Sequence, residues 1–136
     1  MSSGGKLVIT LPWPSADLSP NARLHWAKLG AAKRKARDDA FWMTRSAMGA
    51  QLGPAGTSLS HDGKSDVLLH QTAHAPDARS RDRDNLDSRL KAARDGIAQA
   101  LQVNDRFFRP LGIEWGEPKR GGEVVITIDI PEVPHG

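Results

Sequence analysis

The chain has 136 residues, no cysteine and a formal net charge of +3 at pH 7. Its length fits one domain, residues 1–136, with a modest core, and the lack of cysteine excludes disulfides, cysteine-ligated metals and thiol catalysis. The first ten residues contain no long apolar run, so we expect no signal peptide, no membrane span and a cytoplasmic protein.

Residues 6–12 alternate between apolar and polar side chains, which predicts a strand. Prolines and an asparagine make the next stretch a loop. Over residues 25–50, apolar side chains return at helical spacing, which predicts a long amphipathic helix with one basic side. The apolar residues that carry this pattern are Trp26, Leu29, Ala36, Ala40, Met43 and Ala47. A connection rich in glycine, serine and proline follows over residues 51–65.

The second half of the chain continues with residues 66–76 as a strand, 84–101 as a helix and 107–119 as a third strand, in which Pro110 favours an edge or a bulge. Residues 123–130 predict a fourth strand, paired with the third as a hairpin across the turn at 120–122. Residues 131–136 are expected to fray. The order βαβαββ predicts a single α+β domain with a mixed sheet of about four strands and two main helices.

Basic residues gather on the first predicted helix. Residues 23–45 hold Arg23, Lys28, Lys33, Arg34, Lys35, Arg37 and Arg45 against Asp38 and Asp39. With a sequence pI of about 9.6, this clustering favours a polyanionic partner. A solvated helix face explains the same cluster about equally well.

Two carboxylates, Asp82 and Asp84, stand two residues apart just before the second predicted helix. In an extended chain such residues point to the same face with Cα atoms about 6.6 Å apart, so both carboxylates can converge on one cation. Oxygen ligands alone suit Mg²⁺ or Mn²⁺. The alternative is that Asp84 merely caps the helix and Asp82 is solvated.

The basic residues around this pair favour the metal-site interpretation over the capping interpretation. They are Arg79, Arg81, Arg83, Arg89, Lys91 and Arg94. A site that cleaves phosphodiesters needs acids to hold a metal and bases to hold an anion.

The second helix has two distinct faces at about 100° per residue. Its core side consists of Leu86, Leu90, Ala93, Ile97 and Leu101, and its polar stripe of Asp84, Ser88, Lys91 and Asp95. Lys91 lies about 10 Å along the axis from Asp84, and its side chain leans towards the N-terminus, so it can approach the acidic pair. An ordinary surface ion pair with Asp95 is the alternative.

Asp105 is a third candidate acid, with a role in a turn as its alternative.

The other chemically capable residues offer less. The five histidines show no metal-ligand spacing, and no glycine-rich phosphate loop or Ser/His/Asp arrangement stands out. The four tryptophans are predicted to pack in the core or in loops rather than to stack on bases; they are Trp13, Trp26, Trp42 and Trp115.

Four stretches together resemble the RusA-type Holliday-junction resolvases of phages and prophages. They are ITLPWP (9–14), PDARSRDRDNLDSRLKAARD (76–95), ND (104–105) and KRGGEVVITI (119–128), in the family's order and across most of the chain. The Asp-x-Asp-Asn after an arginine run is the specific part.

The resemblance implies a Mg²⁺-dependent homodimer, with Mn²⁺ as a substitute, that nicks two strands symmetrically at a four-way DNA junction. The acidic pair of the motif matches Asp82 and Asp84, the later essential aspartate matches Asp105, and the functional lysine matches Lys91. The chain departs from the family in two places. Ser88 stands four residues after the second aspartate, where the best-known members have that lysine, and Asn104 precedes Asp105 where two adjacent acids are common.

We therefore expect a metal-dependent, structure-selective DNA endonuclease. Asp82, Asp84 and Asp105 would bind Mg²⁺, and Lys91 would stabilise the transition-state phosphate or position the water. The residues expected to hold DNA phosphates are Arg79, Arg81, Arg83 and Arg89, together with Lys28, Lys33, Arg34, Lys35 and Arg37 of the first helix. The alternative is a non-catalytic nucleic-acid-binding protein with capping acids and no metal.

The predicted helix also separates Asp105 from the acidic pair. A helix over 84–101 is about 26 Å long, and the four residues to Asp105 reach back about 13 Å at most, which leaves about 12 Å to Asp84. Either Gly96 ends the helix early, or Asp105 joins the acidic pair of the other subunit of a two-fold dimer. We favour the composite site across the dimer.

Overall fold

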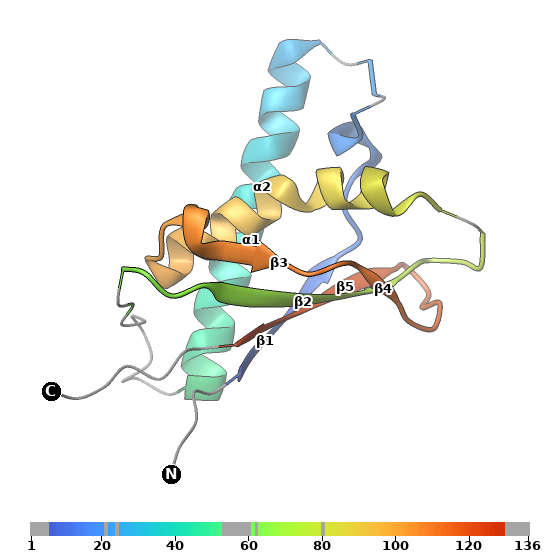
Figure 1. The fold of residues 1–136 in the computed structure, drawn as a ribbon. Coiled ribbons are helices and arrows are strands. Elements are labelled where there is room, and N and C mark those ends of the chain that lie inside the picture. The colour runs from blue at the N-terminus through green and yellow to red at the C-terminus, as the bar shows by residue number, and fades with distance from the viewer. Residues whose placement is uncertain are drawn as a thin grey trace, which may run out of the picture.

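The computed structural model describes residues 6–20, 22–23, 25–52, 61, 63–79 and 81–129. Two helices pack on one face of a mixed sheet, so the α+β prediction is confirmed (Figure 1). In chain order the elements are β1 (Lys6–Pro12), η1 (Ala16–Leu18), α1 (Trp26–Leu52), β2 (Val67–His74), α2 (Arg83–Leu101), η3 (Asp105–Phe107), β3 (Phe108–Pro110), β4 (Glu114–Trp115) and β5 (Glu123–Asp129). The predicted tail, 131–136, lies outside the described residues.

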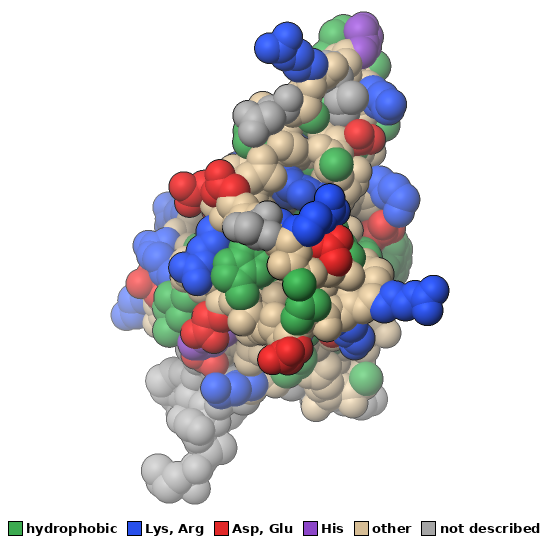
Figure 2. All heavy atoms as spheres, turned by 90° about the vertical axis from the view of Figure 1, so that its right-hand side faces the viewer, with side chains coloured by type: hydrophobic (Ala, Val, Ile, Leu, Met, Phe, Trp, Pro, Cys, Tyr) green, Lys and Arg blue, Asp and Glu red, His purple; other side chains and the backbone are tan. Residues whose placement is uncertain are grey.

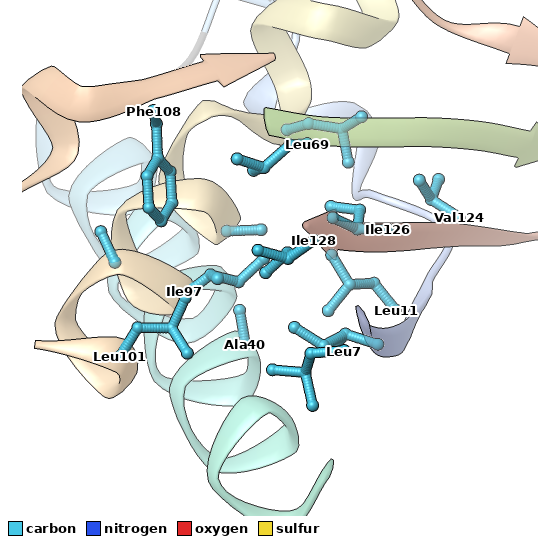
Figure 3. Packing of buried hydrophobic residues seen from close by; sticks show 14 of the residues in the cluster. Leu7, Leu11, Ala40, Leu69, Ile97, Leu101, Phe108, Val124, Ile126 and Ile128 are labelled. Carbon is cyan, nitrogen blue, oxygen red and sulfur yellow. The ribbon is translucent and has the colours of Figure 1, made fainter. Parts of the chain in front are cut away.

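The sheet buries one face because its three long strands alternate. In β1 the side chains of Leu7, Ile9 and Leu11 are buried, while the residues between them are exposed. β2 and β5 show the same alternation, as expected of strands with one face on the core. Figure 3 shows the buried side chains of the sheet facing the two helices, with Ile128 of β5 opposite Ile97 and Leu101 of α2.

The pairing of the last strand differs from the prediction. β5 lies between β1 and β2 and is antiparallel to both, so that Ile128 is opposite Leu7 on one side and Leu69 on the other. Because both edges of β5 are occupied, it cannot form the predicted hairpin with the segment before it. That prediction was wrong.

The third strand, predicted over 107–119, is divided in the structure into two short strands, β3 and β4. β3 and β4 both pair in parallel with β2, and the chain leaves the ladder between them. Pro110 has no N–H to donate, and the Gln71 side chain bonds the carbonyl of Leu111 at 2.8 Å inside this gap. Gly121 and Gly122 then adopt positive φ, 83° and 73°, in the turn that leads to β5.

The helix α2 follows its predicted faces. All five residues of its predicted core side are buried, and the helix runs without a break. Gly96 does not end it. A Cβ on Gly96 would lie 2.1 Å from the carbonyl oxygen of Arg37, so this glycine is the point at which α1 crosses α2 in close contact.

The buried side of α1 agrees with the predicted apolar side only in part: Ala40 is buried and Ala36 and Ala47 are half-buried, whereas Met43 is exposed. Ala40, Thr44 and Met48 are buried, whereas Trp26 is 79% exposed and Trp42 is 67% exposed. Both lie on a helix and are exposed, so the prediction that these two tryptophans pack in the core or in loops was wrong. Alanine-rich helices carry a weak periodic signal, because alanine is tolerated on either face. Among the described residues, no helix combines the length and the apolar character that a membrane crossing requires.

Candidate metal and nucleic-acid site

The acidic pair lies at the start of α2. Asp82 is the N-cap: its Oδ1 accepts a hydrogen bond from the Asp84 N–H at 2.9 Å, and its carbonyl accepts from Leu86 at 3.1 Å. The cap is therefore Asp82, and the alternative that placed it at Asp84 was wrong. Only Asp82 is extended, since Asp84 already lies in the first helical turn, so the extended-chain argument for a shared face does not hold.

Both carboxylates nevertheless face solvent at one helix end. Asp82 and Asp84 are exposed, and the positive end of the helix dipole favours negative charge there. Neither forms an ion pair with any described residue of the chain. On this side of the molecule, basic and acidic side chains are interspersed around small apolar patches (Figure 2).

A polar pocket of about 170 Å³ opens beside Asp82. It is lined by Trp13, Arg81, Asp82, Asn85, Leu86 and Arg89. The loop that begins just after β1 supplies the tryptophan. The other five residues come from the start of α2, its cap and the residue before the cap. Two predicted phosphate-binding arginines and one predicted metal ligand thus share one pocket.

Arg81 is held in place by the loop before α2. Its side chain is only 17% exposed, with Nη2 2.9 Å from the Asp77 carboxylate and Nη1 bonded to the carbonyls of Asp77 and Arg79. Its guanidinium lies 5.7 Å from the centre of the Trp13 ring, within the range of a cation–π contact. The Arg79 N–H, and then its guanidinium, lower the pKa of Asp77 to about 2.

Arg89 ties α2 to the segment that follows β1. Its Nε donates to the carbonyl of Ser15 at 3.1 Å, and its Nη2 donates to the carbonyl of Pro14. Partial burial, and then the charge of Arg81, lower the pKa of Arg89. Two guanidinium groups that line one pocket attract an anion between them.

Sequence reasoning missed two residues of this pocket. Asn85 donates from Nδ2 to the Ser19 hydroxyl at 2.8 Å and so joins α2 to the η1 segment. A signal existed, because Asn85 lies three residues after Asp82 and therefore on the same side of the helix. Trp13 was predicted only as packing, since no local pattern shows which helix a loop tryptophan will meet.

Lys91 and Asp105 are not brought to the pair within this chain. Lys91 is 72% exposed, and its Nζ lies 3.8 Å from Asp95, one turn further from the acids. Asp105 begins η3, beyond the far end of the unbroken α2 (Figure 1). Among the described residues, no three His, Asp or Glu side chains converge as a metal site would require.

The other predicted phosphate-binding residues are distributed more widely. Arg79 and Arg83 are exposed near the start of α2, and Lys28 and Lys35 border a cleft between α1 and α2. Lys33, Arg34 and Arg37 point elsewhere around α1 at about 100° per residue, so the prediction of one basic side does not hold. Arg94 is internal: it is 12% exposed and bonds Asp87 and Gln71.

No known family profile matches the chain. A protein of Xylella fastidiosa, described as uncharacterized, is 42% identical to it over 120 residues, which are 88% of this chain and 74% of that protein. The chain belongs to the family of this protein. The aligned stretch covers most of the chain, so the two proteins share the fold; the description of the relative adds no activity.

Proposed function

We propose that the protein is a metal-dependent, structure-selective DNA endonuclease that nicks four-way junctions, as its resemblance to the RusA-type resolvases implies. The observation that carries the proposal is the pair of exposed carboxylates, Asp82 and Asp84, beside a pocket lined by Arg81 and Arg89. Anionic metal ligands next to fixed cations are what a site for phosphodiester cleavage needs.

The residues at the start of α2 fit a Mg²⁺ ion bound together with substrate. Mg²⁺ is commonly held by one or two carboxylates plus phosphate oxygens, with water in the remaining positions. The carboxylate of Asp84 and the Oδ2 of Asp82 have no hydrogen bond to another described residue, although Oδ1 of Asp82 is engaged in the cap. When bound, the ion would activate a water molecule and neutralise charge on the phosphate. Mn²⁺ suits the same oxygen ligands.

The chain's own residues have separate tasks in this proposal. The bonds of Arg81 and Arg89 to backbone carbonyls fix their guanidinium groups, so they are preorganised to hold a phosphate at the pocket. Arg79 and Arg83 are exposed and would contact neighbouring phosphates along the strand. Lys91 would act on the phosphate only after leaving Asp95, a weak partner at 3.8 Å.

Asp105 would act in the partner subunit. The unbroken α2 removes the option that Gly96 brings Asp105 back to its own acidic pair. A two-fold homodimer can supply Asp105 in trans, since each subunit would give and receive the same group. A dimer also suits a four-way junction, which needs two symmetric cuts.

A non-catalytic nucleic-acid-binding protein is the second candidate, favoured by the role of Asp82 as a helix cap. In that case the acids stabilise α2, and the basic residues alone bind DNA. The two functions differ in what Mg²⁺ does: it supports cleavage in the first and only weakens binding as a salt in the second.

The deciding experiment uses a synthetic four-way junction with each strand labelled in turn. We expect paired nicks with Mg²⁺ or Mn²⁺ and none with a chelator. Asp82→Asn should lower the rate about 100-fold or more while junction binding is kept or tightened. Asparagine caps helices as well as aspartate does, so the melting temperature of this variant should not change. Binding without cleavage in either metal, or full activity of Asp82→Asn, would exclude the proposed chemistry.

A further inference from the structure

A second, larger cleft lies next to the polar pocket and shares two walls with it. It encloses about 470 Å³ between the end of β1, the first half of α1 and α2. Trp13 and Arg89 line both spaces. The volume lies within the range of about 300–1,000 Å³ that is usual for small-molecule sites.

The cleft arises from the way in which the two helices cross. At Gly96 the backbone of α1 touches α2, and from there the N-terminal halves of the helices diverge (Figure 1). Four of the residues that line the gap from α1 are alanines, among them Ala32 and Ala36, so the gap stays open. Its floor is apolar and buried, with Leu11 and Leu90 contributing from β1 and α2.

The rim of the cleft is charged. Lys28, Lys35 and Arg89 border it, and so do the carboxylates of Asp17 and Asp39. Lys35 is paired with Asp39 at 2.6 Å, which leaves a small excess of positive charge from Lys28 and Arg89 over Asp17. The floor of the cleft is apolar and its rim is weakly basic. This combination complements a flat ring whose neighbouring groups on both sides are negatively charged.

We propose that this cleft takes one unstacked nucleobase from the DNA strand whose phosphate lies at Asp82 and Asp84. This inference rests on the proposed function and adds to it the conformation of the substrate. The wall shared through Trp13 and Arg89 makes the cleft adjacent to the polar pocket, with Trp13 available as a stacking surface. A base at a junction branch point has lost part of its stacking, so it is extruded at lower cost than a base within a duplex. The cleft would thereby contribute selectivity for branched DNA.

The test fills the cleft without disturbing the core. Ala32 is half-buried and borders the open space, so Ala32→Leu adds three carbons to the cleft itself. Ala50→Leu makes the same change at an exposed position of α1 outside the cleft and serves as the control. The first readout is the junction cleavage rate. We expect Ala32→Leu to lower it about tenfold or more, with Ala50→Leu equal to wild type.

The second readout is the fluorescence of 2-aminopurine placed in turn at each nucleotide around the branch point, with Ca²⁺ in place of Mg²⁺ to prevent cutting. One position should change its fluorescence on binding to wild type and to Ala50→Leu but not to Ala32→Leu. If wild type cuts the junction and Ala32→Leu cuts and fluoresces like it, the cleft does not hold a base, whereas the proposed function stands. If wild type does not cut at all, the proposed function fails and takes this inference with it. A change of oligomeric state in Ala32→Leu, measured by sedimentation, would identify the cleft as a subunit interface and overturn the proposal.

Discussion

The crossing of α1 and α2 at Gly96 allows a quantitative prediction. In Gly96→Ala the new Cβ would lie 2.1 Å from the carbonyl oxygen of Arg37, whereas ordinary contacts begin at 3.4 Å. The helices must therefore separate by about 1.3 Å, the difference between these two distances. The oxygen belongs to the backbone of α1 and the Cβ is bonded directly to the backbone of α2, so no flexible side chain can absorb the shift.

Two opposing contributions set the size of the effect. Alanine gains about 1 kcal/mol over glycine from helix propensity. Overpacking costs about 1–3 kcal/mol, and a collision with backbone belongs at the upper end. The net loss is then about 2 kcal/mol in the free energy of unfolding, which lowers the melting temperature by about 6–10 °C for a domain of this size.

The assay is thermal and urea unfolding followed by circular dichroism. Gly49→Ala is the matched control, because Gly49 also lies in a helix and a Cβ there would meet nothing within 4 Å. This control should be more stable than wild type by about 0.4–1 kcal/mol. A Gly96→Ala protein as stable as Gly49→Ala would refute the close crossing, and with it the origin of the cleft.

The remaining predictions concern the site and its surroundings. The hydrogen bonds from the Arg79 N–H and then from the Arg79 and Arg81 guanidinium groups lower the folded-state pKa of Asp77 from 3.8 to about 2, so they contribute stability above pH 4 that is lost as the pH falls towards 2. Urea midpoints of Asp77→Asn should therefore depend less on pH than those of wild type over this window. Lys91→Ala should slow junction cleavage about tenfold or more while the Kd changes little, since a transition-state contact is seen mainly in the rate, and equal losses of rate and binding would argue against that role. Asp82→Asn and Asp105→Asn, each inactive alone, should regain nicking when mixed, because a heterodimer with composite sites has one intact site; a mixture that stays inactive would place each site within one chain.

Local patterns were sufficient for the elements whose two sides differ strongly. The leucine and isoleucine residues of α2 all lie on one side, so this side must face the core. The alternation of apolar and polar residues in β1 likewise shows which face of the strand is buried. The side of α1 could not be read in the same way, since alanine provides little contrast. Burial of Thr44 depends on a bond from its hydroxyl to the carbonyl of Ala40, at 2.7 Å, which no hydrophobic pattern reveals.

The strand order required information that the sequence does not carry locally. Residues 119–123 suggest a hairpin because KRGGE is good turn chemistry, and the turn does form. Its strands do not pair, however, because β5 is more fully buried between β1 and β2 than it would be at an edge beside β3. Such a choice depends on the burial of the whole sheet.

The candidate site was predictable in its residue types but not in its geometry. Both aspartates of the pair are good caps, and choosing between Asp82 and Asp84 moves the start of α2 by two residues, within the usual uncertainty of helix boundaries. If the helix began two residues later, both aspartates would precede its first turn; as it is, Asp82 is the cap and Asp84 lies in the first turn. The tethers formed by Arg89 are still less predictable, since its partners Ser15 and Pro14 are 74 and 75 residues away in sequence.

Arg89 connects the two spaces on which the proposals depend. Its guanidinium lines both the polar pocket and the larger cleft, and its bonds to carbonyls fix the loop that carries Trp13. Lysine at this position would keep the charge but could not reproduce a planar fork that donates to two adjacent carbonyls. The chemistry of the pocket and the shape of the cleft are therefore coupled through one side chain. A phosphate held at the pocket and a base held in the cleft would stabilise the same position of this loop, so each should favour the binding of the other.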